Sequence, residues 1–248
     1  MIQLINLHKS FDHQEVLKGV SLEIPMGKTT AIIGRSGGGK SVLLKHIVGL
    51  IQPDSGQILM DGKDITTLGE VELNQVKSRF GMLFQGAALF DSLTVFDNIA
   101  FPLREKTDLS EKEIQEKVRR LLKELGLSGM EAKYPDEISG GMRKRVGLAR
   151  ALITEPEIML YDEPTTGLDP IMENTIHELI QACHKLFHST DILVSHNMKE
   201  VYKIAHYVAM LHEGLIVEQG TPEEIRASKN PVVQQFISGS TSGPIQID

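Results

Sequence analysis

The 248-residue sequence predicts an α/β fold. Short apolar segments of strand type alternate with segments of helical periodicity, a pattern typical of a mainly parallel sheet covered by helices. One apolar segment, TTAIIG (29–34), runs directly into a glycine-rich loop and then into a helical segment. A long interval, 91–153, reads as helical throughout. These observations predict an α/β core interrupted by a helical insertion.

The strands are expected in two groups, one on each side of the insertion. MIQLINL and EVLKGVSLEI are candidates for antiparallel pairing, and TTAIIG, SGQILMDG and RFGMLFQ follow them. After the insertion, strands return as EIMLYDE, TDILVSH, YVAMLHEG and LIVEQG. We therefore expect a domain over 1–238, with a core of 1–90 and 154–225. The small, polar tail 239–248 is expected to be mobile or held only by a partner.

Capping signals mark the starts of several helices. Ser110 and Glu113 form a capping box, after which one helical face is apolar: Ile114, Val118, Leu121, Leu122 and Leu125. A second helix follows a Ser-Gly-Gly turn, and its apolar face holds Met142, Val146, Ala149 and Ile153. A short helix is predicted to open at 221–224, with Thr221 as cap, Pro222 in the first position and Glu224 in the third.

Composition and charge exclude several classes of protein. The formal net charge of −7 makes nonspecific nucleic-acid binding a poor interpretation. The single cysteine, Cys183, excludes an intramolecular disulfide and fits a reducing compartment. The N-terminus lacks the order of a secretory signal, and no apolar run approaches the ~20 residues of a membrane span. We expect a cytosolic protein unless a partner carries it to a membrane.

The segment GRSGGGKS (34–41) matches G-x-x-x-x-G-K-S/T between a strand and a helix, the context that a phosphate-binding loop requires. Its glycines allow successive N–H groups to face phosphates. Lys40 would reach the β- and γ-phosphates, and the Ser41 hydroxyl would bind Mg²⁺. The candidate nucleotide-binding residues are Gly34, Arg35, Ser36, Gly37, Gly38, Gly39, Lys40, Ser41 and Val42.

Polar side chains end three of the predicted strands. Asp162 and Glu163 follow an apolar strand, where α/β sheets place ligand groups. Asp162 is the expected Mg²⁺ partner through water, and Glu163, on the opposite face of the strand, is the expected general base. Gln85 and His196 also end strands. Gln85 could orient the attacking water or act as a ligand of the metal, and His196 could contact charge developing on the γ-phosphate.

A second anion site is predicted at Ser139, Gly140 and Gly141, because a helix that begins there presents free N–H groups and a positive dipole end. Either the same domain folds this turn back over its own phosphate loop, or a second copy of the chain supplies it. The following basic residues could serve a dimer interface or the field of the cleft. Arg143 and Lys144 could equally be solvated on an exposed face.

The motifs GRSGGGKS, Gln85, ISGGM, IMLYDEP, TGLD and SHN resemble, in order and spacing, those of ABC-transporter ATPase subunits over 1–220. This resemblance implies a P-loop NTPase (RecA-like) core with an antiparallel β subdomain and an inserted α-helical subdomain. It also implies a head-to-tail dimer that holds two ATP molecules. By the same resemblance Phe11 stacks on adenine, Ser139, Gly140 and Gly141 contact the opposite γ-phosphate, Asp169 joins the two sites, and His196 is the switch histidine.

The segment ISGGM (138–142) corresponds to the signature motif of the family. It departs from the usual pattern at both ends, with Ile138 for Leu and Met142 for Gln. Met142, QGAALFDSLTVFDNIAFPLRE and LYDEPTTGLDPI resemble the ATPases of bacterial Mla/Mce-type phospholipid transporters. That resemblance implies an integral-membrane permease dimer, a periplasmic MCE lipid-binding protein, a small cytosolic STAS-type partner and no nucleic acid. A coupling helix of the permease would dock on Leu89, Phe90, Leu93 and Phe96, although core packing of these side chains is the alternative.

The resemblance implies an ATP-hydrolysing motor subunit, with ATP and Mg²⁺, at the cytoplasmic face of a bacterial inner membrane. It would drive phospholipid movement between the inner and outer membranes. An importer ATPase for a small polar solute, such as an amino acid, is an alternative within the family. A soluble ATPase acting on DNA or ribosomes is another, although such proteins usually have a long coiled coil or two ATPase halves.

Overall fold

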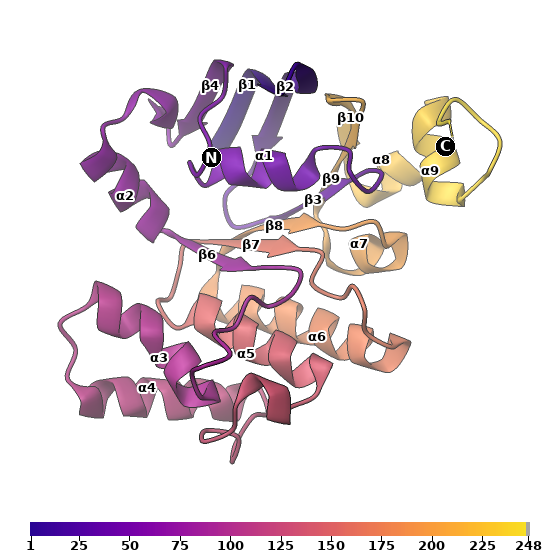
Figure 1. Cartoon of the computed structure of the whole chain (residues 1–248). Coiled ribbons are helices and arrows are strands. Elements are labelled where there is room, and N and C mark those ends of the chain that lie inside the picture. Colours follow the sequence, from indigo (N-terminus) through magenta and orange to yellow (C-terminus); the bar gives the residue numbers. More distant parts are fainter. Residues whose placement is uncertain (247–248) are drawn as a thin grey trace. The chain divides into compact units, whose positions relative to one another are not determined.

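The computed structural model describes residues 1–246, so the last two residues of the expected tail, Ile247 and Asp248, lie outside the described part. The chain forms two compact units (Figure 1). The first comprises residues 1–78 and the chain from Thr190 onward, and the second comprises Arg79–Ser189. Within 1–246, no helix has the length and apolar character needed to cross a bilayer.

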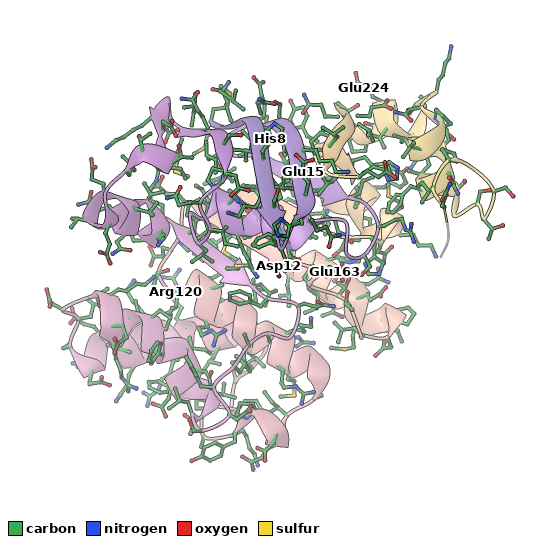
Figure 2. The ribbon with its side chains drawn as sticks, turned by 45° about the horizontal axis from the view of Figure 1, so that its top comes forward. His8, Asp12, Glu15, Arg120, Glu163 and Glu224 are labelled. Atoms are coloured by element: carbon green, nitrogen blue, oxygen red, sulfur yellow. The ribbon has the colours of Figure 1, made fainter. Side chains whose placement is uncertain are left out.

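The first unit contains a four-stranded antiparallel sheet in the order β2-β1-β4-β5. Its strands are β1 (Ile2–Phe11), β2 (Gln14–Ile24), β4 (Ser55–Met60) and β5 (Lys63–Asp64). The predicted antiparallel pairing of the two N-terminal segments is confirmed. Asp12 and His13, both with positive φ (45° and 69°), turn the chain between β1 and β2. His8 and Glu15 face each other across this hairpin, near Asp12, with 3.3 Å between His8 Nδ1 and Glu15 Oε1 (Figure 2).

A second group of strands in the first unit has the order β10-β9-β3-β8. β3 (Thr29–Ile33) is buried throughout and pairs in parallel with β8 (Thr190–Val194) and β9 (Tyr207–His212), while β10 (Leu215–Gly220) pairs antiparallel with β9. A parallel strand buried on both faces requires a continuous apolar sequence, which TTAII provides. The helical segments of this unit are α1 (Lys40–Ile47), η1 (Ile65–Thr67), α2 (Glu70–Ser78), α7 (Met198–Ile204), α8 (Pro222–Arg226) and α9 (Pro231–Ser238).

The second unit pairs two parallel strands, β6 (Phe80–Leu83) and β7 (Ile158–Asp162). Its helical segments are α3 (Val95–Lys106), α4 (Glu111–Glu124), η2 (Pro135–Glu137), α5 (Gly140–Leu152) and α6 (Pro170–Phe187). The apolar face predicted for the helix after Ser110 is confirmed as buried, and so is the capping box. Cys183 lies on α6 and is buried.

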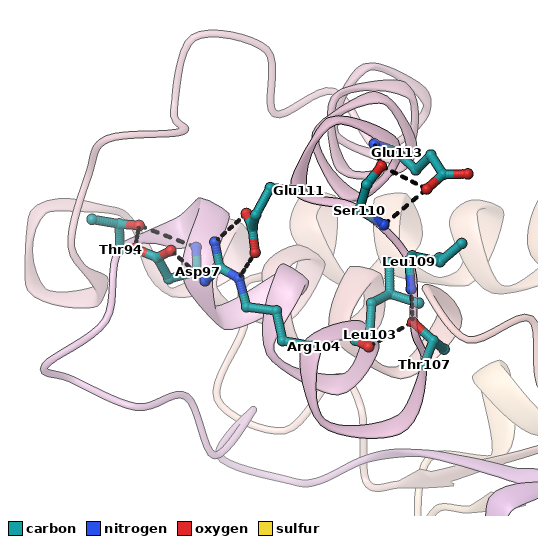
Figure 3. A network of polar contacts seen from close by, with 9 residues as sticks. All are labelled: Thr94, Asp97, Leu103, Arg104, Thr107, Leu109, Ser110, Glu111 and Glu113. Carbon is teal, nitrogen blue, oxygen red and sulfur yellow. Dashed lines mark hydrogen bonds and ion pairs between the residues drawn. The ribbon is translucent and has the colours of Figure 1, made fainter.

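The corner between α3 and α4 is fixed by a polar network around Arg104 (Figure 3). Its guanidinium donates from Nη1 to Asp97 Oδ1 at 2.9 Å and from Nε and Nη2 to Glu111 at 2.8 and 3.0 Å. Thr94 caps α3 and also donates to Asp97. A planar guanidinium that bridges two carboxylates fixes direction as well as distance, so this corner is expected to be rigid.

The described part of the tail contacts α9 of the same chain. The backbone N–H of Ile245 donates to Gln235 Oε1 at 2.6 Å, and Gln235 Nε2 donates to the Ile245 carbonyl at 3.0 Å. Ile245 is buried. One glutamine thus satisfies both backbone groups of a tail residue, and the Ile245 side chain supplies an apolar anchor.

Candidate nucleotide-binding site

The phosphate-binding loop begins where β3 ends. Gly34 has φ +149°, and a Cβ at this position would lie 2.2 Å from the carbonyl oxygen of Leu211 on β9. Only glycine therefore allows the loop to leave the sheet here. At the far end of the loop Gly39 is the N-cap of α1, and no side chain caps that helix. A helix start without a side-chain cap directs its first N–H groups and its positive dipole end at an anion.

Lys40 is buried, and its Nζ donates to the carbonyl oxygens of Gly34 at 2.9 Å and Arg35 at 2.7 Å. The ammonium group therefore lies over the loop that the glycines form. Ser41 follows it in the first turn of α1 and is exposed, so its hydroxyl is accessible to a ligand. An uncapped helix start, a curled glycine loop and a buried ammonium group fit the triphosphate of a nucleotide.

His196 lies at the same edge of the sheet as the phosphate loop. β3 and β8 are parallel, with Ile32 opposite Val194, and Gly34 and His196 each lie two residues beyond this pair. His196 is exposed, while its neighbour Ser195 is buried, donates to Glu200 and accepts from the Asn197 N–H at 3.0 Å. These bonds fix the turn that presents the imidazole.

The second unit brings together three predicted site residues. β6 and β7 are parallel, with Leu83 opposite Tyr161, so Gln85, Asp162 and Glu163 lie at one sheet edge. Gln85 Nε2 donates to Glu163 Oε2 at 3.4 Å, and Thr166 Oγ1 donates to the same oxygen at 3.1 Å. The Glu163 carboxylate is therefore held by two donors.

The prediction that Asp162 and Glu163 point to opposite faces of one strand is wrong. β7 ends at Asp162, and Glu163 has φ +46°, so alternation along a strand does not set its direction. The left-handed backbone turns the chain at Glu163 instead. A non-glycine residue in this region is uncommon and occurs preferentially at functional positions.

The Ser-Gly-Gly turn starts α5, as predicted. Ser139 Oγ accepts from the Met142 N–H at 3.3 Å and caps the helix. A Cβ on Gly141 would lie 2.1 Å from Met172 Cε, so the turn packs closely on the start of α6. Asp169 caps α6 by accepting from the N–H groups of Ile171 and Met172 at 2.9 and 3.1 Å. The turn and Asp169 are therefore neighbours within this unit.

Comparison with known proteins agrees with this set of motifs. Residues 17–166 match the ABC transporter family. The chain belongs to the ABC transporter family. It is therefore an ATP-binding and ATP-hydrolysing subunit, as the motifs predicted. It is 43% identical over 244 residues to the probable ribonucleotide transport ATP-binding protein mkl of Mycobacterium leprae, covering 98% of this chain and 70% of that protein.

Two further comparisons bear on function. The chain is 41% identical over 246 residues to the intermembrane phospholipid transport system ATP-binding protein MlaF of Haemophilus influenzae, covering 99% of this chain and 93% of that protein. Its structure is similar to the dimeric, post-hydrolysis ATP-binding cassette MJ0796 bound to ADP and Pi, with a TM-score of 0.82, 29% identity and coverage of 90% and 99%.

Two basic side chains of the signature helix α5 have partners that sequence reasoning missed. Lys144 is 6% exposed and donates to the carbonyl oxygen of Gln85, so the interpretation of Lys144 as a solvated residue is wrong. Arg150 donates to the carbonyl oxygens of Ala88 and Ala87 at 2.7 and 2.8 Å. Both basic groups therefore bind backbone of their own chain.

Phe11 ends β1 and is 40% exposed, so part of its ring is accessible to solvent. The Lys9 ammonium group lies 5.5 Å from its ring centroid. Asp54 Oδ1 accepts from Lys9 Nζ at 2.7 Å, and Asp54 Oδ2 accepts from the Ser10 N–H at 2.7 Å. The hydrogen bond from Lys9 is the main reason that the pKa of Asp54 is lowered. Asp54 thus holds the two residues before Phe11.

The segment after Gln85 borders a groove of about 380 Å³ in the second unit. Among the predicted coupling residues, Phe90 is 46% exposed, whereas Leu89, Leu93 and Phe96 are half-buried. The apolar lining of the groove consists largely of Phe80, Met82, Phe84, Phe90, Phe101 and Pro102. Phe90 therefore lies at the surface, whereas the side chains of Leu89, Leu93 and Phe96 are in part packed into the core.

Proposed function

We propose that this chain is the ATP-hydrolysing subunit of a bacterial transporter that moves phospholipids between inner and outer membrane, working at the cytoplasmic face of the inner membrane. The hydrogen-bonded Glu163 carboxylate, with donors from Gln85 and Thr166, carries the catalytic part of this proposal. The near full-length similarity to MlaF supports phospholipid as the cargo.

The local structure around each motif residue supports a specific role for it. Lys40 and the N–H groups of residues 34–42 would bind the phosphates, and Phe11 would stack on the adenine. Ser41, Asp162 and Gln85 have the oxygen donors that Mg²⁺ prefers, and that ion would neutralise charge on the phosphates. Ser139, Gly140 and Gly141 of a second copy would contact the γ-phosphate, and Asp169 would lie where the two sites join.

Glu163 acts as the general base: its carboxylate accepts a proton from the water that attacks the γ-phosphorus. Gln85 and Thr166 orient that carboxylate, and His196 contacts the developing charge. Binding of ATP closes the dimer, and phosphate release reopens it. A permease dimer would receive this motion at the groove beside Phe90, with a periplasmic MCE protein and a small STAS-type protein completing the complex.

The relative mkl, described as a probable ribonucleotide transport protein, supports a second candidate, a polar-solute transporter. The chain covers 93% of MlaF but 70% of mkl, which favours the phospholipid assignment. The two candidates differ in the molecule that stimulates hydrolysis.

The test uses the complex purified with its membrane subunits and reconstituted in phospholipid vesicles. Phospholipid bound to the purified complex, and movement of a fluorescent phospholipid that stops in Glu163→Gln, would support the proposal. Glu155→Gln is a matched control, since Glu155 also has a left-handed backbone (φ 52°) and lies in the same unit. Stimulation by ribonucleotides without phospholipid movement would overturn the proposal.

A further inference from the structure

Two side chains of α5 bind main-chain carbonyl groups in the segment 85–88. Lys144 donates to the Gln85 carbonyl, and the Arg150 guanidinium donates to the carbonyls of Ala87 and Ala88. These contacts join positions 59 to 63 residues apart in the sequence. Figure 1 shows the chain that leaves β6 passing α5, the helix that carries both basic residues.

The segment held in this way has a conformation that its own residues disfavour. Ala87 and Ala88 have φ of +60° and +47°, in the left-handed region that alanine rarely adopts. Ala87 is also buried against Gly147, where an added Cβ would lie 3.0 Å from Ala87 Cβ. A conformation of this kind persists only when surrounding contacts enforce it.

The hydrogen bonds from Lys144 and Arg150 on α5 can hold Ala87 and Ala88 in this left-handed conformation. Lys144 is nearly fully buried and Arg150 is half-buried, and burial lowers the pKa of Arg150 from its ordinary value. Arg150 also lies over the Phe90 ring, with 5.7 Å between its Cζ and the ring centroid. Hydrogen bonds from charged donors are stronger when the donor is shielded from water. The two N–H groups of one guanidinium also fix the orientation of the two carbonyl groups that they bind.

The same segment positions the side chain that contacts the expected general base. Gln85 Nε2 lies 3.4 Å from Glu163 Oε2, a long hydrogen bond that a small backbone shift would break. We propose that Lys144 and Arg150 are positioning residues for hydrolysis: they hold the backbone after Gln85 so that its amide stays on Glu163. They thereby connect the helix that starts at Ser139 to the catalytic carboxylate.

This inference rests on the proposed role of Gln85. A double-mutant cycle distinguishes that role from the positioning role of Lys144. Four forms of the full-length chain in its membrane complex are compared: wild type, Gln85→Ala, Lys144→Met and the double variant. We expect about a tenfold lower kcat for each single variant with KM for ATP within about twofold, and little further loss in the double variant. Lys144→Gln keeps a donor and should recover most of the activity.

Arg150→Lys supplies a second variant, which keeps the charge and stem but loses the guanidinium fork. Amide hydrogen exchange over residues 85–90 should rise in Lys144→Met and Arg150→Lys at unchanged melting temperature. Lys117→Met and Arg120→Lys are matched controls, since these α4 residues form ion pairs at the protein surface, with Glu155 and Glu124.

The outcomes are distinguishable. Full kcat in Gln85→Ala would overturn the proposed role of Gln85 itself. A loss in Gln85→Ala with normal kcat in Lys144→Met and Arg150→Lys would overturn the positioning role alone. Additive losses in the double variant, or unchanged exchange over 85–90, would also overturn it.

Discussion

Replacing Gly34 with alanine should destabilise the protein through a backbone collision that does not involve nucleotide. The new Cβ would lie 2.2 Å from the Leu211 carbonyl oxygen, and φ of +149° is almost restricted to glycine. Strain of this kind costs about 1–3 kcal/mol, and forced overpacking adds about 1–3 kcal/mol. The sum, about 2–6 kcal/mol, corresponds to a melting temperature lower by roughly 4–24 °C for a chain of this size.

Gly37→Ala is the matched control in the same loop. Gly37 also has a positive φ (+74°), but an added Cβ would have no atom within 4 Å. Its cost should be the backbone term alone, about 1–2 kcal/mol. Thermal unfolding followed by circular dichroism, without nucleotide, compares the two variants. Equal melting temperatures for Gly34→Ala and Gly37→Ala would refute the collision argument.

Three further predictions concern catalysis, base recognition and pH. Glu163→Gln should lower kcat by about 10²–10⁴-fold, measured by phosphate release, and should keep its nucleotide affinity, measured by equilibrium binding. The control Glu155→Gln should have normal activity. Asp54→Asn should raise KM for ATP by about threefold at unchanged kcat, because Lys9 and the chain before Phe11 lose their anchor, and an unchanged KM would contradict this reading. His46 is buried, which is the main reason that its pKa lies below the ordinary 6.5, so the unfolded chain binds this proton more readily than the folded chain. The free energy of unfolding should therefore rise with pH up to about 6.5, and His46→Gln should flatten that slope in denaturant titrations.

The strand-end residues could be predicted from the sequence because parallel strands share one carboxyl edge. Gln85 and Glu163 were expected near each other on that ground, and their side chains lie 3.4 Å apart. The capping boxes at Ser110 and Thr221 could be predicted because each of their hydrogen bonds joins residues that are close in the sequence. Local chemistry and strand topology therefore account for most of the candidate site.

Long-range partners of charged side chains could not be predicted. Periodicity assigns a lysine between apolar positions to solvent, yet Lys144 is buried because a carbonyl 59 residues upstream accepts from it. Nothing in the sequence near Gln85 indicates this bond. Thr166 was missed for another reason: its hydroxyl reaches Glu163 only because Glu163 adopts a left-handed backbone, which glutamate rarely does.

The buried thiol of Cys183 has a practical consequence for labelling chemistry. The chain has one cysteine and no tryptophan, and that cysteine is 6% exposed. A buried thiol in apolar surroundings reacts slowly with maleimides and other alkylating reagents. A cysteine introduced at an exposed position would then carry a spin label or fluorophore selectively in the natural background, and an introduced tryptophan would be the sole indole emitter. Opening and closing of the ATPase could thus be followed spectroscopically without first removing a native residue.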